Sequence, residues 1–138
     1  MSSDVYVKVA GLAEFRRGLR GIDKGSGKQV RAALNQVAQV LVDEARPEIP
    51  SVTGAARSSL RAQSSQTTAK VAAGGPKAPY YAWLDFGGRV GRRKQTKRAV
   101  ISGGRYIYPT LEREREKINR VMLEAMTQLA AANGIEVD

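Results

Sequence analysis

Cysteine and histidine are both absent from this chain of 138 residues. Without cysteine the protein has no disulfide bond, no thiol nucleophile and no thiolate ligand for zinc. Without histidine it lacks imidazole metal ligands and the serine–histidine or cysteine–histidine couples of many hydrolases. It also lacks the one side chain that titrates near neutral pH without perturbation. The two absences therefore exclude most nucleophilic and zinc-dependent catalysis.

Long hydrophobic stretches are missing as well. No apolar run approaches the roughly 20 residues that a membrane-spanning helix needs. The first residues, Met1-Ser2-Ser3-Asp4-Val5, do not show the basic-then-apolar pattern of a signal peptide. A chain of this length fits one domain with a real core. We expect a single domain over residues 1–138, without membrane contact, made and kept in a cytoplasm.

Acidic side chains are scarce in the middle of the chain. Residues 49–111 contain eleven lysines or arginines and one acid, Asp85, so this segment carries the whole net charge of +10. Six of these cations crowd into ten residues: Arg89, Arg92, Arg93, Lys94, Lys97 and Arg98. A solvated loop that keeps the protein soluble would account for them, and so would a surface that contacts phosphates or an acidic protein.

Hydrophobic periodicity predicts the elements of the first third of the chain. Alternating valines over 5–9 predict a short strand, and apolar residues three or four apart predict a short helix over 12–22. A longer helix is expected from a Ser26 cap to about Arg46. It ends there because Pro47 has no backbone donor and disfavours a helical conformation in the residue before it. The apolar face of this helix consists of Val30, Ala33, Leu34, Val37, Val40, Leu41 and Ala45.

Shorter elements are predicted from the centre of the chain. Residues 58–73 alternate as two antiparallel strands around a turn at 65–67. Residues 79–86 are rich in aromatic side chains and predict a short helix halted by Gly87-Gly88.

A second hairpin is expected after the cationic cluster. Val100-Ile101 and Tyr106-Ile107-Tyr108 are predicted to be strands on either side of a Gly103-Gly104 turn. The cations ahead of this hairpin would then lie on a projecting arm over about 87–108.

A final helix is predicted from Pro109 through about Ala132, with pairs such as Glu116–Arg120 at i, i+4. Helices at the ends with strands between them predict an α+β fold. In this fold a small antiparallel sheet packs against a long central helix and a C-terminal helix, and a basic loop or hairpin arm projects from it.

Carboxylates are the usual alternative to histidine in acid–base and metal chemistry. Asp85 has no acidic neighbour closer in sequence than Glu48 or Glu112, so we expect it to hold a nearby arginine or to cap a turn. The segment Gly87-Gly88-Arg89-Val90-Gly91 lacks the Gly-Lys-Ser/Thr ending of a Walker loop and the spacing of a dinucleotide loop. We predict no catalytic, cofactor-binding or metal-binding residues, no cofactor, and no enzymatic activity.

The charge of the chain, taken alone, is compatible with nucleic-acid binding. The sequence pI is about 10.3, and five aromatic residues flank the cationic cluster: Tyr80, Tyr81, Trp83, Tyr106 and Tyr108. However, Trp83 and Phe86 stand at helical spacing, which favours a core position over a base-stacking platform. No recognised DNA- or RNA-reading motif is present, so such binding would be nonspecific and sensitive to salt.

Three stretches, taken in order, carry a family resemblance. The first is Ala45-Arg46-Pro47-Glu48-Ile49-Pro50 followed by Thr53-Gly54-Ala55-Ala56-Arg57-Ser58-Ser59-Leu60. The second is Tyr81-Ala82-Trp83-Leu84-Asp85-Phe86-Gly87-Gly88, and the third is Arg105-Tyr106-Ile107-Tyr108-Pro109-Thr110-Leu111. Together they resemble the small head–tail connector or tail-completion (neck) proteins of long-tailed bacteriophages. Val52 stands where that family often has a basic residue, and Asp85 replaces its usual glutamate.

The resemblance implies a structural virion protein without an active site, made in the host cytoplasm. It would form a homo-oligomeric ring of six or twelve subunits in the neck, joining the portal/head complex to the tail tube. The implied partners are adjacent head-connector and tail-terminator or tail-tube proteins, and nonspecific contact with DNA in the channel stays open. The alternatives are a tail-terminator ring that caps the tail tube and, from a different class, a nonspecific nucleic-acid-binding protein. The candidate interface residues are Arg89, Arg92, Arg93, Lys94, Lys97, Arg98, Arg105 and Tyr106.

Overall fold

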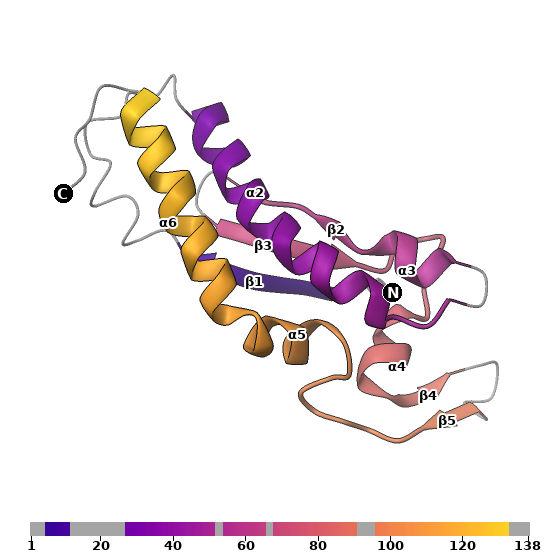
Figure 1. Cartoon of the computed structure of the whole chain (residues 1–138). Helices are drawn as coiled ribbons and strands as arrows, with labels where there is room; N and C mark the ends of the chain where they lie inside the picture. The colour runs from indigo at the N-terminus through magenta and orange to yellow at the C-terminus, as the bar shows by residue number, and fades with distance from the viewer. Residues whose placement is uncertain (1–4, 12–26, 52–53, 66–67, 91–95, 133–138) are drawn as a thin grey trace.

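The computed structural model describes residues 5–11, 27–51, 54–65, 68–90 and 96–132. The fold is α+β, as predicted, with a three-stranded antiparallel sheet lying against a layer of two long helices (Figure 1). The predicted helix over 12–22 lies outside the described residues.

The sheet has the strand order β1-β3-β2, formed by β1 (Val5–Gly11), β3 (Thr68–Ala73) and β2 (Arg61–Ala62). Val7 pairs with Val71, and both side chains are fully buried on the face that meets the helices. A register shift between Lys8 and Ala10 makes a bulge in β1. The strand at 5–9 and the hairpin within 58–73 are therefore confirmed, although β2 is only two residues long.

Helix α2 (Gly27–Ala45) is the long helix that the apolar periodicity predicts. Its inward side chains fill the centre of the core, and Leu34, Val37 and Leu41 are at most 1% exposed. The α-helix ends at Ala45, and a 3-10 turn, η2 (Arg46–Glu48), holds Pro47. A proline at this point cannot donate the next helical hydrogen bond, so the helix stops where the sequence predicts.

Two short helices connect the larger elements, one between η2 and β2 and the other between β3 and the arm. Helix α3 (Ala55–Ser59), which the sequence does not predict, begins after Gly54, whose φ of 84° lies in the left-handed region. Helix α4 (Tyr81–Phe86) confirms the short helix expected over 79–86, and it ends at Gly87.

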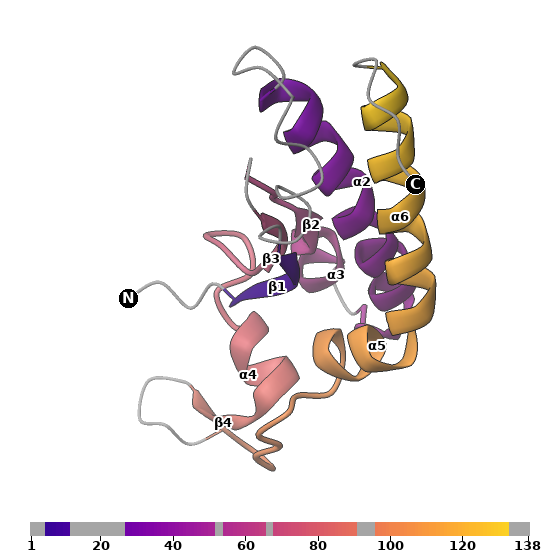
Figure 2. The same cartoon turned by 90° about the vertical axis from the view of Figure 1, so that its left-hand side faces the viewer.

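The C-terminal helix is present but divided. Helix α5 (Ile107–Arg113) packs on α2 and β1, and after Glu114 helix α6 (Arg115–Ala132) runs along α2 (Figure 2). Pro109 lies in the first turn of α5, as expected of a residue without a backbone donor. The buried side chains Ile107, Ile118 and Leu129 join these two helices to the core.

The predicted hairpin around Gly103-Gly104 is wrong. Residues 100–101 form no strand, and Ile107 and Tyr108 are helical. The helix wins because Ile107 and Thr110, one turn apart, are both buried against the core, which an extended segment could not achieve. The hairpin of the arm instead consists of β4 (Gly88–Val90) and β5 (Thr96–Arg98), on either side of the cationic residues 91–95.

Candidate functional site: the basic arm

The arm projects from the end of α4, away from the layers of the sheet and the long helices (Figures 1 and 2). Its two strands pair antiparallel, with Gly88 opposite Arg98, Arg89 opposite Lys97 and Val90 opposite Thr96. Alternate residues of a strand point to opposite faces. The register therefore puts Arg89 and Lys97 together on one face of the hairpin and Arg98 on the other.

Asp85 fixes the root of the arm. Its side chain is fully buried at the end of α4. Carboxylate Oδ1 accepts hydrogen bonds from the backbone amides of Arg105, at 2.6 Å, and Tyr106, at 3.0 Å. Oδ2 accepts one from the Tyr81 hydroxyl at 3.0 Å. The predicted turn-capping role is thus confirmed, and Arg105 is held through its backbone amide.

Burial raises the pKa of the Tyr81 hydroxyl far above its ordinary value, and the neighbouring Asp85 charge raises it further. The hydroxyl therefore stays protonated and can donate to the carboxylate at any neutral pH. A buried carboxylate is costly unless its oxygens accept hydrogen bonds, and these three donors supply them.

Two glycines allow the segments at the root to approach one another. A Cβ on Gly104 would lie 2.6 Å from Asp85 Oδ1, and a Cβ on Gly87 would lie 2.1 Å from the carbonyl oxygen of Ala99. Both residues also have positive φ, 77° and 88°. Both positions need a residue that adopts a positive φ and has no Cβ, and only glycine meets both requirements.

Two of the predicted interface arginines contact their own chain at this root. Arg98 donates to the Leu84 carbonyl at 3.0 Å and to the Tyr106 hydroxyl at 3.0 Å, and its guanidinium lies 5.6 Å from the centre of the Trp83 ring. Arg105 donates to the main-chain carbonyls of Asp85 and Ala99. These bonds join both ends of the arm to α4.

The remaining predicted interface residues differ in their exposure. Arg89 and Lys97 are exposed on the hairpin, and Tyr106 is buried at 8% exposure, where α5 begins. Arg92, Arg93 and Lys94 lie outside the described residues. An interface role for the whole set stays a prediction, and Arg89 and Lys97 are the described members whose side chains are most exposed.

An exposed apolar strip at the root of the arm was not anticipated from the sequence. Val100 is 74% exposed, Ile101 44% and Tyr108 41%, and the Tyr108 ring packs against that of Phe86 with 6.1 Å between centres. No local pattern predicts this exposure, because two adjacent β-branched residues are as typical of a strand as of a surface segment.

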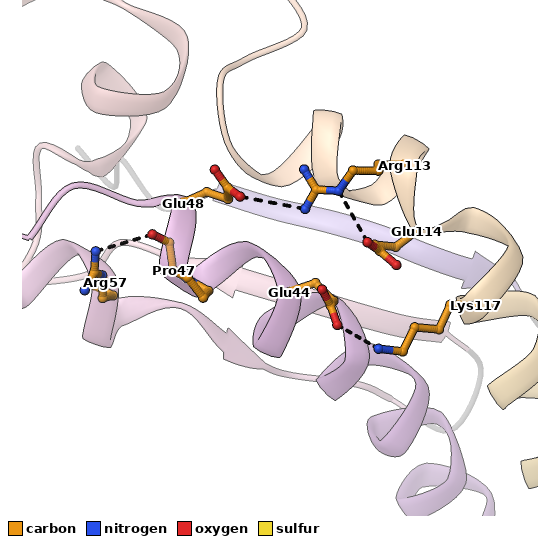
Figure 3. Close-up of polar contacts among 7 residues, drawn as sticks. All are labelled: Glu44, Pro47, Glu48, Arg57, Arg113, Glu114 and Lys117. Carbon is orange, nitrogen blue, oxygen red and sulfur yellow. Dashed lines mark hydrogen bonds and ion pairs between the residues drawn. The ribbon is translucent and has the colours of Figure 1, made fainter.

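The first stretch of the family resemblance is held together by two arginines. Arg57 donates to the carbonyls of Ile49 and Pro47, and the contact with Pro47 is drawn in Figure 3. In the other direction, Arg46 donates to the Leu60 carbonyl at 2.8 Å. The proline-ended helix and the segment that follows Gly54 thus form one packed unit.

An acidic strip, defined as Asp43, Glu44, Glu48 and Glu114, lies where the end of α2 and η2 meets the α5–α6 junction. Two cations lie among these acids. Lys117 binds Glu44 at 2.7 Å, and Arg113 contacts both Glu48 and Glu114 (Figure 3). The hydrogen bond and charge of Glu44, with the charges of Glu114 and Asp43, raise the pKa of Lys117. With Arg46, which lies in η2 between Glu44 and Glu48, the strip has four acids and three bases and a local net charge of −1. The predicted Glu116–Arg120 pair is not among the ion pairs formed by the described residues.

Comparison with known proteins identifies the family. Residues 13–87, more than half of the chain, match a family model described as "Bacteriophage HK97-gp10, putative tail-component". The chain belongs to the HK97-gp10-like family. The resemblance to small phage neck and tail-completion proteins is thereby confirmed, and this HK97-gp10-like chain is a structural tail-component protein of the phage virion.

The matched segment of the HK97-gp10-like chain ends at Gly87, where the arm begins. It includes the first stretch of the resemblance and all but the last residue of the second. No curated protein and no solved structure matches the chain. Within the described ranges, no helix is both long and apolar enough to span a bilayer.

Proposed function

We propose that this protein is a non-catalytic ring subunit of the phage neck, which joins the portal/head complex to the tail tube. The observation that carries the proposal is a cationic hairpin clamped to the core of an HK97-gp10-like tail component. We propose that the protein acts through its shape and its contacts with other subunits. Subunits pack side by side in a homo-oligomer of six or twelve copies, and their arms dock on neighbouring subunits or on the rings above and below.

The hydrogen bonds of Asp85, Arg98 and Arg105 at the root of the arm, called the clamp below, support a docking role because they fix the direction of the arm before a partner binds. Ordering a segment at the moment of binding reduces affinity, and a preorganised segment avoids that cost. The hydrogen bonds of Asp85, Arg98 and Arg105 supply this order within the monomer.

The proposed partners are the adjacent head-connector protein and the tail-terminator or tail-tube protein, at the head–tail junction of the virion. Family membership supports contact with phage structural proteins, and the sequence gives the arm the charge to meet an acidic surface.

Charge reversal in the sequence between β4 and β5 tests the proposal. The triple variant R92E/R93E/K94E should fold normally, because charged side chains replace charged side chains, and should fail to support the joining of heads to tails in an in vitro complementation assay. Circular dichroism checks the fold, and electron microscopy counts joined particles. The matched control K28E/K77E/R120E changes the net charge equally at exposed positions outside the arm and should join heads to tails normally. Normal joining by the arm variant would contradict the proposed role of the arm.

Nonspecific nucleic-acid binding is separated from this function by filter binding across a salt series. Tight duplex binding with a steep salt slope, together with normal head–tail joining by the arm variant, would favour the nucleic-acid function instead.

A further inference from the structure

The outer face of the hairpin carries an uncompensated pair of like charges. Arg89 and Lys97 are directly opposite each other across β4 and β5, and both are exposed. Like charges directly opposite in a strand pair destabilise it. Among the ion pairs of the described residues, neither cation meets a carboxylate of its own chain. The repulsion between the two cations decreases when an anionic surface lies against the hairpin.

The surroundings of the pair favour a protein over a nucleic acid as that surface. Val100, Ile101 and Tyr108 expose apolar area at the root of the same arm. A phosphate backbone offers nothing to bury such aliphatic side chains, whereas the apolar centre of a protein interface does. Moreover, Arg98 and Arg105 already donate within their own chain, Arg98 to the Leu84 carbonyl and the Tyr106 hydroxyl and Arg105 to the carbonyls of Asp85 and Ala99. These bonds leave fewer guanidinium donors for bidentate phosphate contacts.

A second copy of the chain offers a surface of the complementary charge. The acidic strip of Asp43, Glu44, Glu48 and Glu114 has a local charge of −1 when Arg46, Arg113 and Lys117 are counted with its acids, and the Arg46 guanidinium donates to the Leu60 carbonyl. Glu48 and Arg113 are both more than half exposed, so this end of the strip is open to a partner. The strip carries an excess of negative charge, and the arm pair carries two positive charges.

From these features we infer that the arm of one subunit docks on the acidic strip of the next subunit. Arg89 and Lys97 lie against Asp43 and Glu48, and the root of the arm buries its apolar strip in the same contact. Because arm and strip are different surfaces, the contact is heterologous and repeats from copy to copy, which closes into a ring when the rotation allows it. This inference rests on the self-assembly in the proposed function, and it names the two faces that make the contact.

Cysteine cross-linking tests the contact directly, because the natural chain has no cysteine. Single variants K97C and E48C are purified, brought to a concentration at which size-exclusion chromatography shows oligomers, mixed, and oxidised. A disulfide-linked heterodimer that neither variant forms alone is the expected product. Mixing K77C with E48C is the control, since Lys77 is exposed outside the arm, and should give no such product.

A charge exchange gives an independent readout. R89E/K97E and D43K/E48K should each weaken self-association about tenfold or more, because each sets like charges against each other. The combined variant R89E/K97E/D43K/E48K should associate nearly as well as the natural chain. K28E/K77E, with the same change of net charge as the arm variant, should leave self-association unchanged.

The outcomes separate this inference from the proposed function. Oligomers without the K97C–E48C product, no rescue in the combined variant, or no self-association at any attainable concentration would each overturn the arm-to-strip contact. The ring proposal is judged separately by the head–tail joining assay. Cross-linking and rescue without any requirement for the protein in joining would instead remove the neck function and keep the contact.

Discussion

Replacing Asp85 with alanine removes the carboxylate that ties the root of the arm to α4. Three donors then lose their acceptor at a fully buried position: the amides of Arg105 and Tyr106 and the hydroxyl of Tyr81. Each buried donor left unsatisfied costs about 1–3 kcal/mol. Part of this cost is offset, because the variant no longer buries a charge and because water can enter the space. We expect D85A to lower the free energy of unfolding by about 2–4 kcal/mol.

The isosteric variant D85N refines this expectation. Its amide oxygen can still accept from Arg105 and Tyr106, while its amide nitrogen must face the Tyr81 hydroxyl, which now loses its acceptor. D85N loses one charge-assisted hydrogen bond, whereas D85A leaves three donors without an acceptor. We therefore expect D85N to lower the free energy of unfolding by about 1–2 kcal/mol. E112A, at an exposed acid, is the control and should change stability by less than about 0.5 kcal/mol.

Urea unfolding measures these differences as shifts of the midpoint at constant slope. Amide hydrogen exchange localises them, because the Arg105 and Tyr106 amides should exchange much faster in D85A, while the amides of α2 exchange as in the natural chain. A D85A variant with the stability of E112A, or with Arg105 and Tyr106 still protected, would refute the clamp.

Two further predictions concern the same cluster. Gly104→Ala should cost about 2–4 kcal/mol, because its Cβ would meet Asp85 Oδ1 at 2.6 Å in a left-handed backbone conformation. The control Gly103→Ala, with nothing within 4 Å of its Cβ, should be nearly neutral in urea unfolding, and equal midpoints would contradict the argument. Tyr81→Phe should cost about 1 kcal/mol at neutral pH through its lost hydrogen bond. The raised pKa of Tyr81 contributes stability below the ordinary tyrosine pKa of 10.0, and this contribution falls as the pH rises beyond it. The stability gap between the natural chain and Tyr81→Phe should therefore narrow above about pH 10 in urea titrations, and a constant gap would show that the hydroxyl does not titrate with unfolding.

The features that depend on local order along the chain could be predicted from the amino-acid sequence. The i, i+3, i+4 spacing predicted α2, and Pro47 predicted its end, because amphipathic periodicity and a missing backbone donor act within a few residues. Alternation likewise predicted β1 and the β2–β3 hairpin. The absence of cysteine and histidine and the acid-poor middle segment were readable without any fold, as was the family resemblance.

Which cations of the acid-poor segment are exposed depends on contacts between segments that are distant in the sequence. Ile107 and Tyr108 are helical instead of extended because the core buries Ile107 and because Asp85, more than twenty residues away in sequence, caps the preceding turn. The same contacts direct Arg98 and Arg105 inward, whereas strand register leaves Arg89 and Lys97 together on the outer face. A sequence gives each of these arginines the same charge. Which of them stays exposed depends on hydrogen bonds and burial between distant segments, and no local pattern encodes those.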